Sequence, residues 1–143
     1  MKLDRLNHIG VAVKDIEKTK DFLKKNFEAE IIHEMVSEGQ GFRSTLVSLG
    51  ELNFELMAPI ENGGIVSEFI NQRGEGIHHL SFQVEDLQST AAFFEQEGLK
   101  SIKVPSEIPG IKALFLHPKS FLGILVELFQ KIEYTETLKE WTR

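Results

Sequence analysis

The same short pattern occurs twice in this chain of 143 residues, and this duplication constrains the fold more than any other feature. In residues 6–16 and again in residues 77–87, an alternating apolar run ends at an aspartate suited to begin a helix. His8 and His79 occupy the same place in the two copies, 71 residues apart. A repeat of this kind predicts a fold made from two equivalent units.

The duplication extends to the far end of each unit. Residues 53–56, which contain Glu55, align with residues 125–128, which contain Glu127. Glu55 follows His8 by 47 residues, and Glu127 follows His79 by 48. Each unit is therefore expected to carry a histidine on its first strand and a glutamate on its last.

Apolar periodicity and turn residues predict the same element order in both units, namely strand, helix, strand, strand, strand. The predicted elements of the first unit are strand 5–13, helix 15–28 and strands 30–36, 42–49 and 52–58; those of the second are strand 77–84, a helix from Asp86 to Gly98, and strands 99–104, 111–116 and 122–129. The predicted buried stripe of the first helix is Ile16, Thr19, Phe22, Leu23 and Phe27, and that of the second includes Ala91 and Phe94.

The length fits one α+β domain over residues 1–143. We expect module one at about 5–59, a connector with a short helix at 60–76, module two at about 77–130, and a tail at 131–143. Neither βαβββ module has enough core to stand alone. The two are therefore expected to form one cupped, eight-stranded half-barrel with its helices outside and a ligand site on its concave face.

Composition excludes several classes of function. The net charge is −6 and no basic tract is present, which argues against nucleic-acid binding. The absence of cysteine removes disulfides, thiolate metal ligands and cysteine nucleophiles. No apolar run reaches the length of a membrane span, and no apolar run after the N-terminus resembles a signal peptide. We expect a cytoplasmic protein without membrane or nucleic-acid partners.

Four side chains are candidate metal ligands because of their repeated spacing. If a pseudo-twofold axis relates the modules, His8, Glu55, His79 and Glu127 converge across it. A carboxylate that interrupts an apolar strand is costly to bury unless it is paired or binds a cation. Two imidazoles and two carboxylates suit a divalent ion with room left for water or substrate. Co²⁺ is our first expectation, with Zn²⁺, Mn²⁺ and Ni²⁺ as alternatives.

The motifs resemble those of the vicinal-oxygen-chelate (glyoxalase/bleomycin-resistance) superfamily and, within it, the methylmalonyl-CoA epimerases. The likeness covers about residues 5–130, and the runs that carry it are residues 7–13, 54–59, 76–79 and 115–120, followed by 125–128. The Gly-Ile-His-His and His-Pro-Lys-Ser runs point to the epimerase branch.

This resemblance implies an enzyme that interconverts (R)- and (S)-methylmalonyl-CoA through a metal-stabilised enolate. His8, Glu55, His79 and Glu127 would hold the metal, although some members have glutamine at the place of Glu55. Inversion needs a proton carrier on each face of the substrate, and Glu127 is the candidate for one of them. Lys119, in the His-Pro-Lys-Ser run, is a weaker candidate for a contact with a CoA phosphate.

Two departures from the epimerase pattern bear on this expectation. Ser44 stands where some epimerases carry a second catalytic glutamate, and a serine cannot hold a proton as a carboxylate does. A water molecule, or another residue such as Glu55, would then have to act. Residues 121–123, Phe-Leu-Gly, replace a smaller segment and would reshape the substrate pocket.

Other functions on the same fold stay open from the sequence. A glyoxalase I-like lactoylglutathione lyase would use the same ligands, and a small-molecule-binding resistance protein would need no complete ligand set. An iron dioxygenase fits less well because it usually has two histidines and one carboxylate. We also expect a homodimer, since small domains of this type often pair about a twofold axis.

Overall fold

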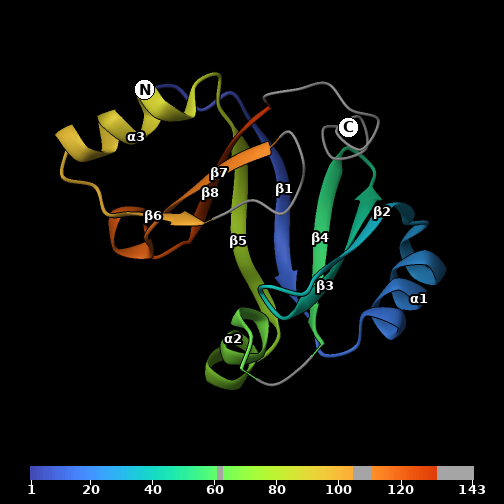
Figure 1. Cartoon of the computed structure of the whole chain (residues 1–143). Helices are drawn as coiled ribbons and strands as arrows, with labels where there is room; N and C mark the ends of the chain where they lie inside the picture. The colour runs from blue at the N-terminus through green and yellow to red at the C-terminus, as the bar shows by residue number, and fades with distance from the viewer. Residues whose placement is uncertain (61–62, 105–110, 132–143) are drawn as a thin grey trace. The chain divides into compact units, whose positions relative to one another are not determined.

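The computed structural model describes residues 1–60, 63–104 and 111–131 (Figure 1). Its helices are α1 (Ile16–Phe27), α2 (Ile65–Arg73), α3 (Leu87–Gln96) and the short 3₁₀ helix η1 (Pro118–Ser120). Its strands are β1 (Arg5–Ala12), β2 (Glu30–Ser37), β3 (Phe42–Leu49), β4 (Leu52–Pro59), β5 (Gly76–Gln83), β6 (Ser101–Val104), β7 (Ile111–Leu116) and β8 (Val126–Lys131).

The strands form one mixed, eight-stranded sheet in the order β2-β3-β4-β1-β5-β8-β7-β6, and the sheet is not closed. The same pairing occurs twice. β1 runs parallel to β4 and β5 parallel to β8, while the remaining strands of each module pair antiparallel to their neighbours. The predicted fold of two βαβββ modules with an open eight-stranded sheet is therefore confirmed.

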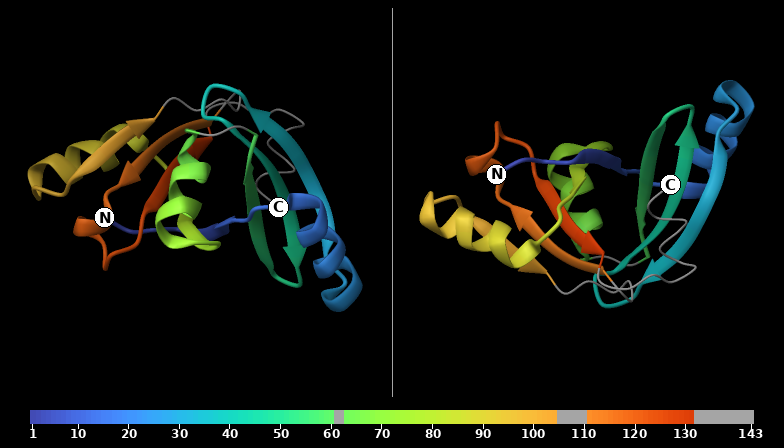
Figure 2. Two further views of the ribbon diagram at one scale, coloured as in Figure 1. Left: turned by 90° about the horizontal axis from the view of Figure 1, so that it is seen from below. Right: turned by 90° about the horizontal axis from the view of Figure 1, so that it is seen from above.

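The chain separates into two compact units. The N-terminal unit is residues 8–78, and the C-terminal unit combines residues 1–7 with the described residues from His79 onward. β1 and β5 each contribute residues to both units. In each unit the longest helix lies along the strands of that same unit (Figure 2). Whether the chain acts as a single domain over residues 1–143 stays a prediction.

The first helix begins as the sequence predicts but buries less than expected. The Asp15 side chain accepts a hydrogen bond from the Lys18 amide, and this bond is the main cause of the lowered pKa of Asp15. Ile16 is buried in a cluster whose buried members are Val13, Ile16, Val47, Leu56 and Ala58. Phe22 and Phe27, predicted to be buried, are more than half exposed and pack edge to face with each other instead.

The C-terminal unit has its core beneath α3. The Asp86 side chain caps this helix by accepting a hydrogen bond from the Ser89 amide. As predicted, Phe94 points inward and is only 1% exposed. It packs with the other buried members of its cluster, which are Val84, Leu114, Leu116, Val126 and Leu128.

Replacing Phe94 with alanine is expected to lower the free energy of unfolding by about 3–5 kcal/mol. The reason is that the ring is almost fully buried, so its removal leaves a cavity as well as losing apolar burial. Urea denaturation followed by circular dichroism measures the effect. Phe22→Ala is the matched control, since Phe22 is 56% exposed and its loss should cost far less. Equal losses for the two variants would contradict the assigned core.

The last strand begins later than the sequence predicts. The sequence predicts a strand over 122–129, but β8 starts at Val126. Leu122 and Gly123 both have positive φ, 51° and 78°, and the Gly123 amide donates to the carbonyl of Pro118. This tight turn replaces the first part of the expected strand, and it leaves the Leu122 side chain 88% exposed.

The predicted tail lies outside the described residues from 132 onward, and so does the segment 105–110 between the strands predicted at 99–104 and 111–116. Among the described residues, none of the helices has the length and apolar character of a membrane span.

The connector helix expected between the modules is present as α2, which packs against β4.

Candidate metal centre

In the N-terminal unit, His8 and Glu55 face each other from two parallel strands. Gly10 of β1 pairs with Glu55 of β4. His8 lies two residues before Gly10, so its side chain emerges on the same face as that of Glu55. Both residues are buried, and His8 Nε2 lies 3.4 Å from Glu55 Oε2.

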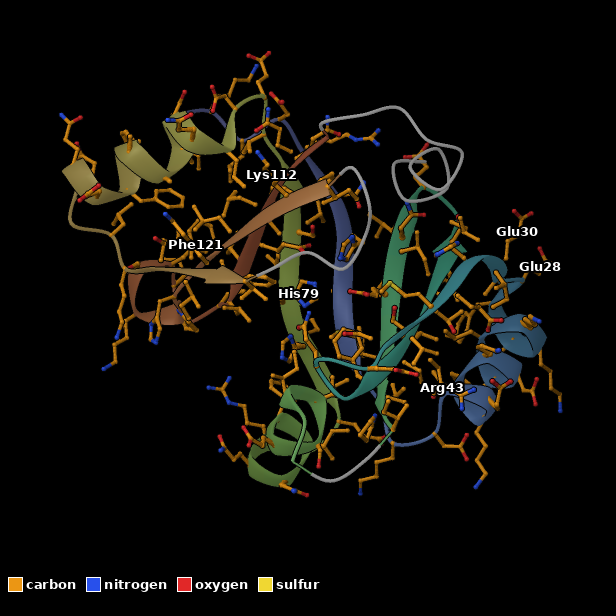
Figure 3. The ribbon with its side chains drawn as sticks, viewed as in Figure 1. Glu28, Glu30, Arg43, His79, Lys112 and Phe121 are labelled. Atoms are coloured by element: carbon orange, nitrogen blue, oxygen red, sulfur yellow. The ribbon has the colours of Figure 1, made fainter. Side chains whose placement is uncertain are left out.

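The C-terminal unit repeats this arrangement with the equivalent residues. Ser81 of β5 pairs with Glu127 of β8, and His79 lies two residues before Ser81. His79 Nε2 is 4.0 Å from Glu127 Oε2. His79 is buried, whereas the Glu127 side chain is 19% exposed. Figure 3 shows His79 on β5. The strand register therefore repeats the histidine–glutamate placement that the duplication predicts.

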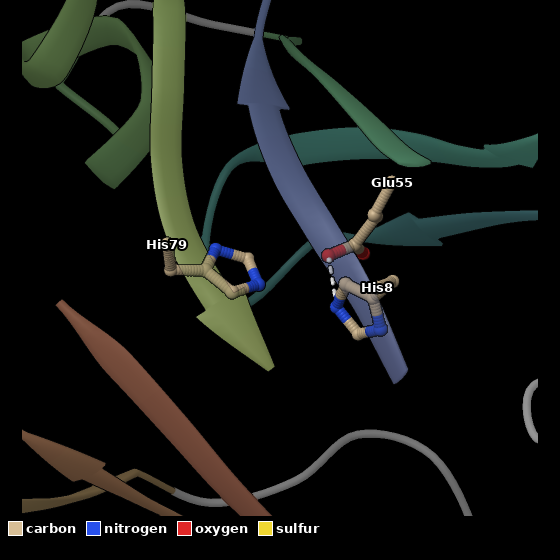
Figure 4. A group of neighbouring side chains, drawn as sticks. All are labelled: His8, Glu55 and His79. Carbon is tan, nitrogen blue, oxygen red and sulfur yellow. Dashed lines mark ion pairs between the residues drawn. The ribbon is translucent and has the colours of Figure 1, made fainter. Parts of the chain in front are cut away.

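A group of three buried side chains, His8, Glu55 and His79, could hold a metal ion (Figure 4). Each offers one ligand atom, and these atoms all lie within 4.8 Å of one another. Among the described residues, Glu127 is not a member of this mutually close group, although it lies beside His79. Three of the four predicted ligands are thus brought together, and the fourth adjoins one of them.

The residues fit a divalent cation by their chemistry and by their spacing. Neutral imidazoles and carboxylates are good ligands for divalent cations. A buried carboxylate such as that of Glu55 is costly unless a positive charge or hydrogen bonds compensate for its burial. Two ligands of one ion, each about 2.1 Å from it, lie about 3.0 to 3.4 Å apart at tetrahedral or octahedral angles. The 3.4 Å separation of His8 and Glu55 is already that of adjacent ligands.

The other histidines have separate roles in the structure. His78 contacts Phe69 of α2 edge to face, with ring centroids 4.9 Å apart. Burial lowers the pKa of His78, which favours its neutral form, and the nearby Glu55 opposes this effect. His117 caps η1, its Nδ1 accepting a hydrogen bond from the Lys119 amide.

Two buried serines of the sheet differ in the hydrogen bonding of their hydroxyl groups. Ser44, at the position of the expected second glutamate, is buried, and its hydroxyl has no hydrogen-bond partner among the described residues. Ser81 is also buried, but its hydroxyl donates to Glu127 Oε2 at 2.5 Å. Sequence reasoning missed Ser81. In the alignment of the two copies Ser81 corresponds to Gly10, and this difference does not by itself indicate a partner for the hydroxyl.

Comparisons with known proteins identify relatives of this chain. The family model described as the Glyoxalase/Bleomycin resistance protein/Dioxygenase superfamily matches residues 7–115. The chain is 30% identical over 132 residues to the mitochondrial methylmalonyl-CoA epimerase of Mus musculus, covering 90% of this chain and 74% of that protein. It is also 30% identical over 134 residues to the ethylmalonyl-CoA/methylmalonyl-CoA epimerase of Cereibacter sphaeroides, covering 90% and 98%.

A solved structure extends the likeness to the fold. A variant of the methylmalonyl-CoA epimerase of Streptomyces coelicolor, in complex with 2-nitronate-propionyl-CoA, matches with a TM-score of 0.83 and 28% identity. The match covers 92% of this chain and 100% of that one.

Proposed function

This chain belongs to the glyoxalase/bleomycin resistance protein/dioxygenase superfamily and to the methylmalonyl-CoA epimerases within it, and we propose that it interconverts (R)- and (S)-methylmalonyl-CoA. The observation that carries the proposal is the buried group of His8, Glu55 and His79. It offers imidazole nitrogens and a carboxylate oxygen, which are suitable ligand atoms for a divalent cation where no cysteine is available. Glu127, placed by the same strand register one module later, would complete the set.

The reaction sets clear demands on the protein. The proton to be moved lies on a carbon between a thioester and a carboxylate, and its removal places negative charge on the thioester oxygen. A divalent cation held by these residues would supply Lewis-acid stabilisation of that charge. We expect Co²⁺ to serve best, with Zn²⁺, Mn²⁺ and Ni²⁺ as substitutes.

The two carboxylates differ in ways that suit different tasks. Glu55 is buried and lies 3.4 Å from His8, which favours a role in holding the cation. Glu127 is more exposed and lies farther from its histidine, at 4.0 Å. A carboxylate that is reached by solvent and lies farther from its histidine is better suited to exchange a proton with substrate. We assign Glu127 as the proton carrier on one face of the substrate.

Proton delivery to the opposite face falls to Glu55 or to a water molecule. Ser44 is on the same sheet face as Glu55, because Met57 pairs with Ser44 and Leu46 with Glu55. Its hydroxyl does not ionise near neutral pH, so it cannot replace a carboxylate as a base. It can donate a hydrogen bond, since it has no partner among the described residues.

Metal removal provides the experiment that tests this function. Co²⁺-loaded protein in D₂O is expected to exchange the α-proton of methylmalonyl-CoA, and protein stripped by a chelator is expected to lose this exchange until Co²⁺ is restored. Nuclear magnetic resonance of the substrate measures both. Exchange that persists undiminished in metal-free protein would contradict the metal-dependent route.

Two further substrates belong in the same assay. Ethylmalonyl-CoA is included because the Cereibacter sphaeroides relative is named for both acyl-CoA esters. The thiohemiacetal of methylglyoxal and glutathione tests the lyase alternative on the same metal-loaded preparation. Conversion of the thiohemiacetal without exchange of methylmalonyl-CoA would replace the epimerase by a glyoxalase I-like lyase. If the protein acts on neither methylmalonyl-CoA nor the thiohemiacetal and binds no metal, a non-catalytic binding protein would be favoured.

Pairing of two copies into a homodimer stays a prediction.

A further inference from the structure

The two modules differ at one position of an otherwise repeated strand register. Opposite Glu55 stands Gly10, which has no side chain. Opposite Glu127 stands Ser81, which is 0% exposed and donates a hydrogen bond from Oγ to Glu127 Oε2 at 2.5 Å. Glu127 therefore has a hydroxyl donor at a place where the first module has only a hydrogen atom.

This hydrogen bond restricts the orientation of the Glu127 carboxylate. The accepting atom, Oε2, is also the one that faces His79 Nε2. An O–H to carboxylate bond at about 2.5–2.7 Å is among the stronger hydrogen bonds in proteins. The Glu127 side chain is partly exposed, so without this bond it would have more freedom to rotate away from His79.

We propose that Ser81 is a positioning residue that holds Oε2 of Glu127 toward His79, so that this carboxylate can meet both the cation and the substrate. The inference rests on the proposed function, in which Glu127 is a metal ligand and proton carrier. Ser81 itself is assigned neither of these two roles. Hydrogen-bond partners behind metal ligands commonly set the orientation of those ligands, and their loss weakens metal binding by about 10- to 100-fold.

Three variants test the role of the hydroxyl. Ser81→Ala removes the donor, and Ser81→Thr keeps it while adding one methyl group. Ser37→Ala is the matched control, because Ser37 is equally buried but its hydroxyl has no hydrogen-bond partner among the described residues. Thermal melting of each variant shows whether it is folded.

The first readout is the affinity of the metal-free protein for Co²⁺, measured by competition with a coloured chelator. Ser81→Ala is expected to weaken Co²⁺ binding by about 10- to 100-fold, whereas Ser37→Ala and Ser81→Thr stay near the wild type. The second readout is kinetic. With Co²⁺ saturating, Ser81→Ala is expected to lower kcat and leave KM nearly unchanged, since the buried Ser81 is proposed to act through Glu127 and not on the substrate itself.

The outcomes separate this inference from the proposed function. If wild-type protein epimerises methylmalonyl-CoA but Ser81→Ala matches it in both Co²⁺ affinity and kcat, the positioning role is wrong and the function stands. If wild-type protein does not act on methylmalonyl-CoA but Ser81→Ala still loses Co²⁺ affinity selectively, the function is wrong and the positioning role stands. Equal losses in the alanine and threonine variants would overturn the role of the hydroxyl, because packing would then explain both.

Discussion

Glutamine in place of Glu127 is expected to lower kcat for methylmalonyl-CoA by about 100-fold or more, the range that a positioned acid–base group contributes. The substitution keeps the size of the side chain and its carbonyl oxygen, so the hydrogen bond from Ser81 can persist. The amide cannot accept and return the α-proton. The rate of α-proton exchange in D₂O, measured at saturating Co²⁺, reports this loss directly.

Glu85→Gln is the control for the change in charge, because Glu85 is an exposed carboxylate of the same unit. It should leave exchange unchanged. Co²⁺ content must be measured for Glu127→Gln, since the residue is also assigned as a ligand. A variant that holds Co²⁺ and exchanges the proton as fast as the wild type would contradict the assignment of Glu127 as proton carrier.

The second large effect concerns the two histidines. His8→Gln and His79→Gln are each expected to weaken Co²⁺ binding by more than the roughly 10- to 100-fold that loss of an outer partner causes, because a direct ligand is removed. Glutamine retains a polar side chain in a buried place and limits the loss of stability. Chelator competition measures affinity, and thermal melting without metal shows whether each variant is folded.

His33→Gln is the matched control for the histidine variants. His33 lies on β2 and is outside the mutually close group, so its replacement should leave Co²⁺ affinity unchanged. Both ligand variants should lose activity together with the metal. Retention of wild-type affinity by either one, in folded protein, would remove that histidine from the site.

Much of the fold was predictable because the duplication carries redundant information. Each module repeats a histidine, a helix-starting aspartate and a glutamate at nearly constant spacing, and the observed registers of Gly10 with Glu55 and Ser81 with Glu127 reflect this. The register of the two parallel pairs, β1 with β4 and β5 with β8, then fixes on which face of the sheet each side chain lies. The proximity of His8 and Glu55 follows from that geometry.

Other features could not be read from the sequence for physical reasons. Phe22 and Phe27 fit a helical apolar stripe, yet both are more than half exposed, and they pack edge to face with each other. Leu122 has an apolar side chain typical of a strand, but the left-handed turn at Leu122 and Gly123 prevents strand pairing there. Apolar periodicity describes neither how far a helix face is covered nor where a local turn delays the start of a strand.

Ser81 shows a different limit of sequence reasoning. A serine in an alternating strand gives no sign of its partner, and only the register with β8 places its hydroxyl at Glu127. The comparison of repeats shows that the first module has glycine at this position, which is a difference rather than a motif. Its meaning depends on the hydrogen bond that the structure reveals.

The most direct test of the central claim is X-ray absorption spectroscopy of Co²⁺-loaded protein combined with metal analysis. The duplicated histidine–glutamate pairs are proposed to hold a common cation, so we predict one Co²⁺ per chain with two imidazole ligands and oxygen ligands for the rest. Two Co²⁺ ions per chain with one imidazole each, or a single ion with fewer than two imidazoles, would contradict the shared site.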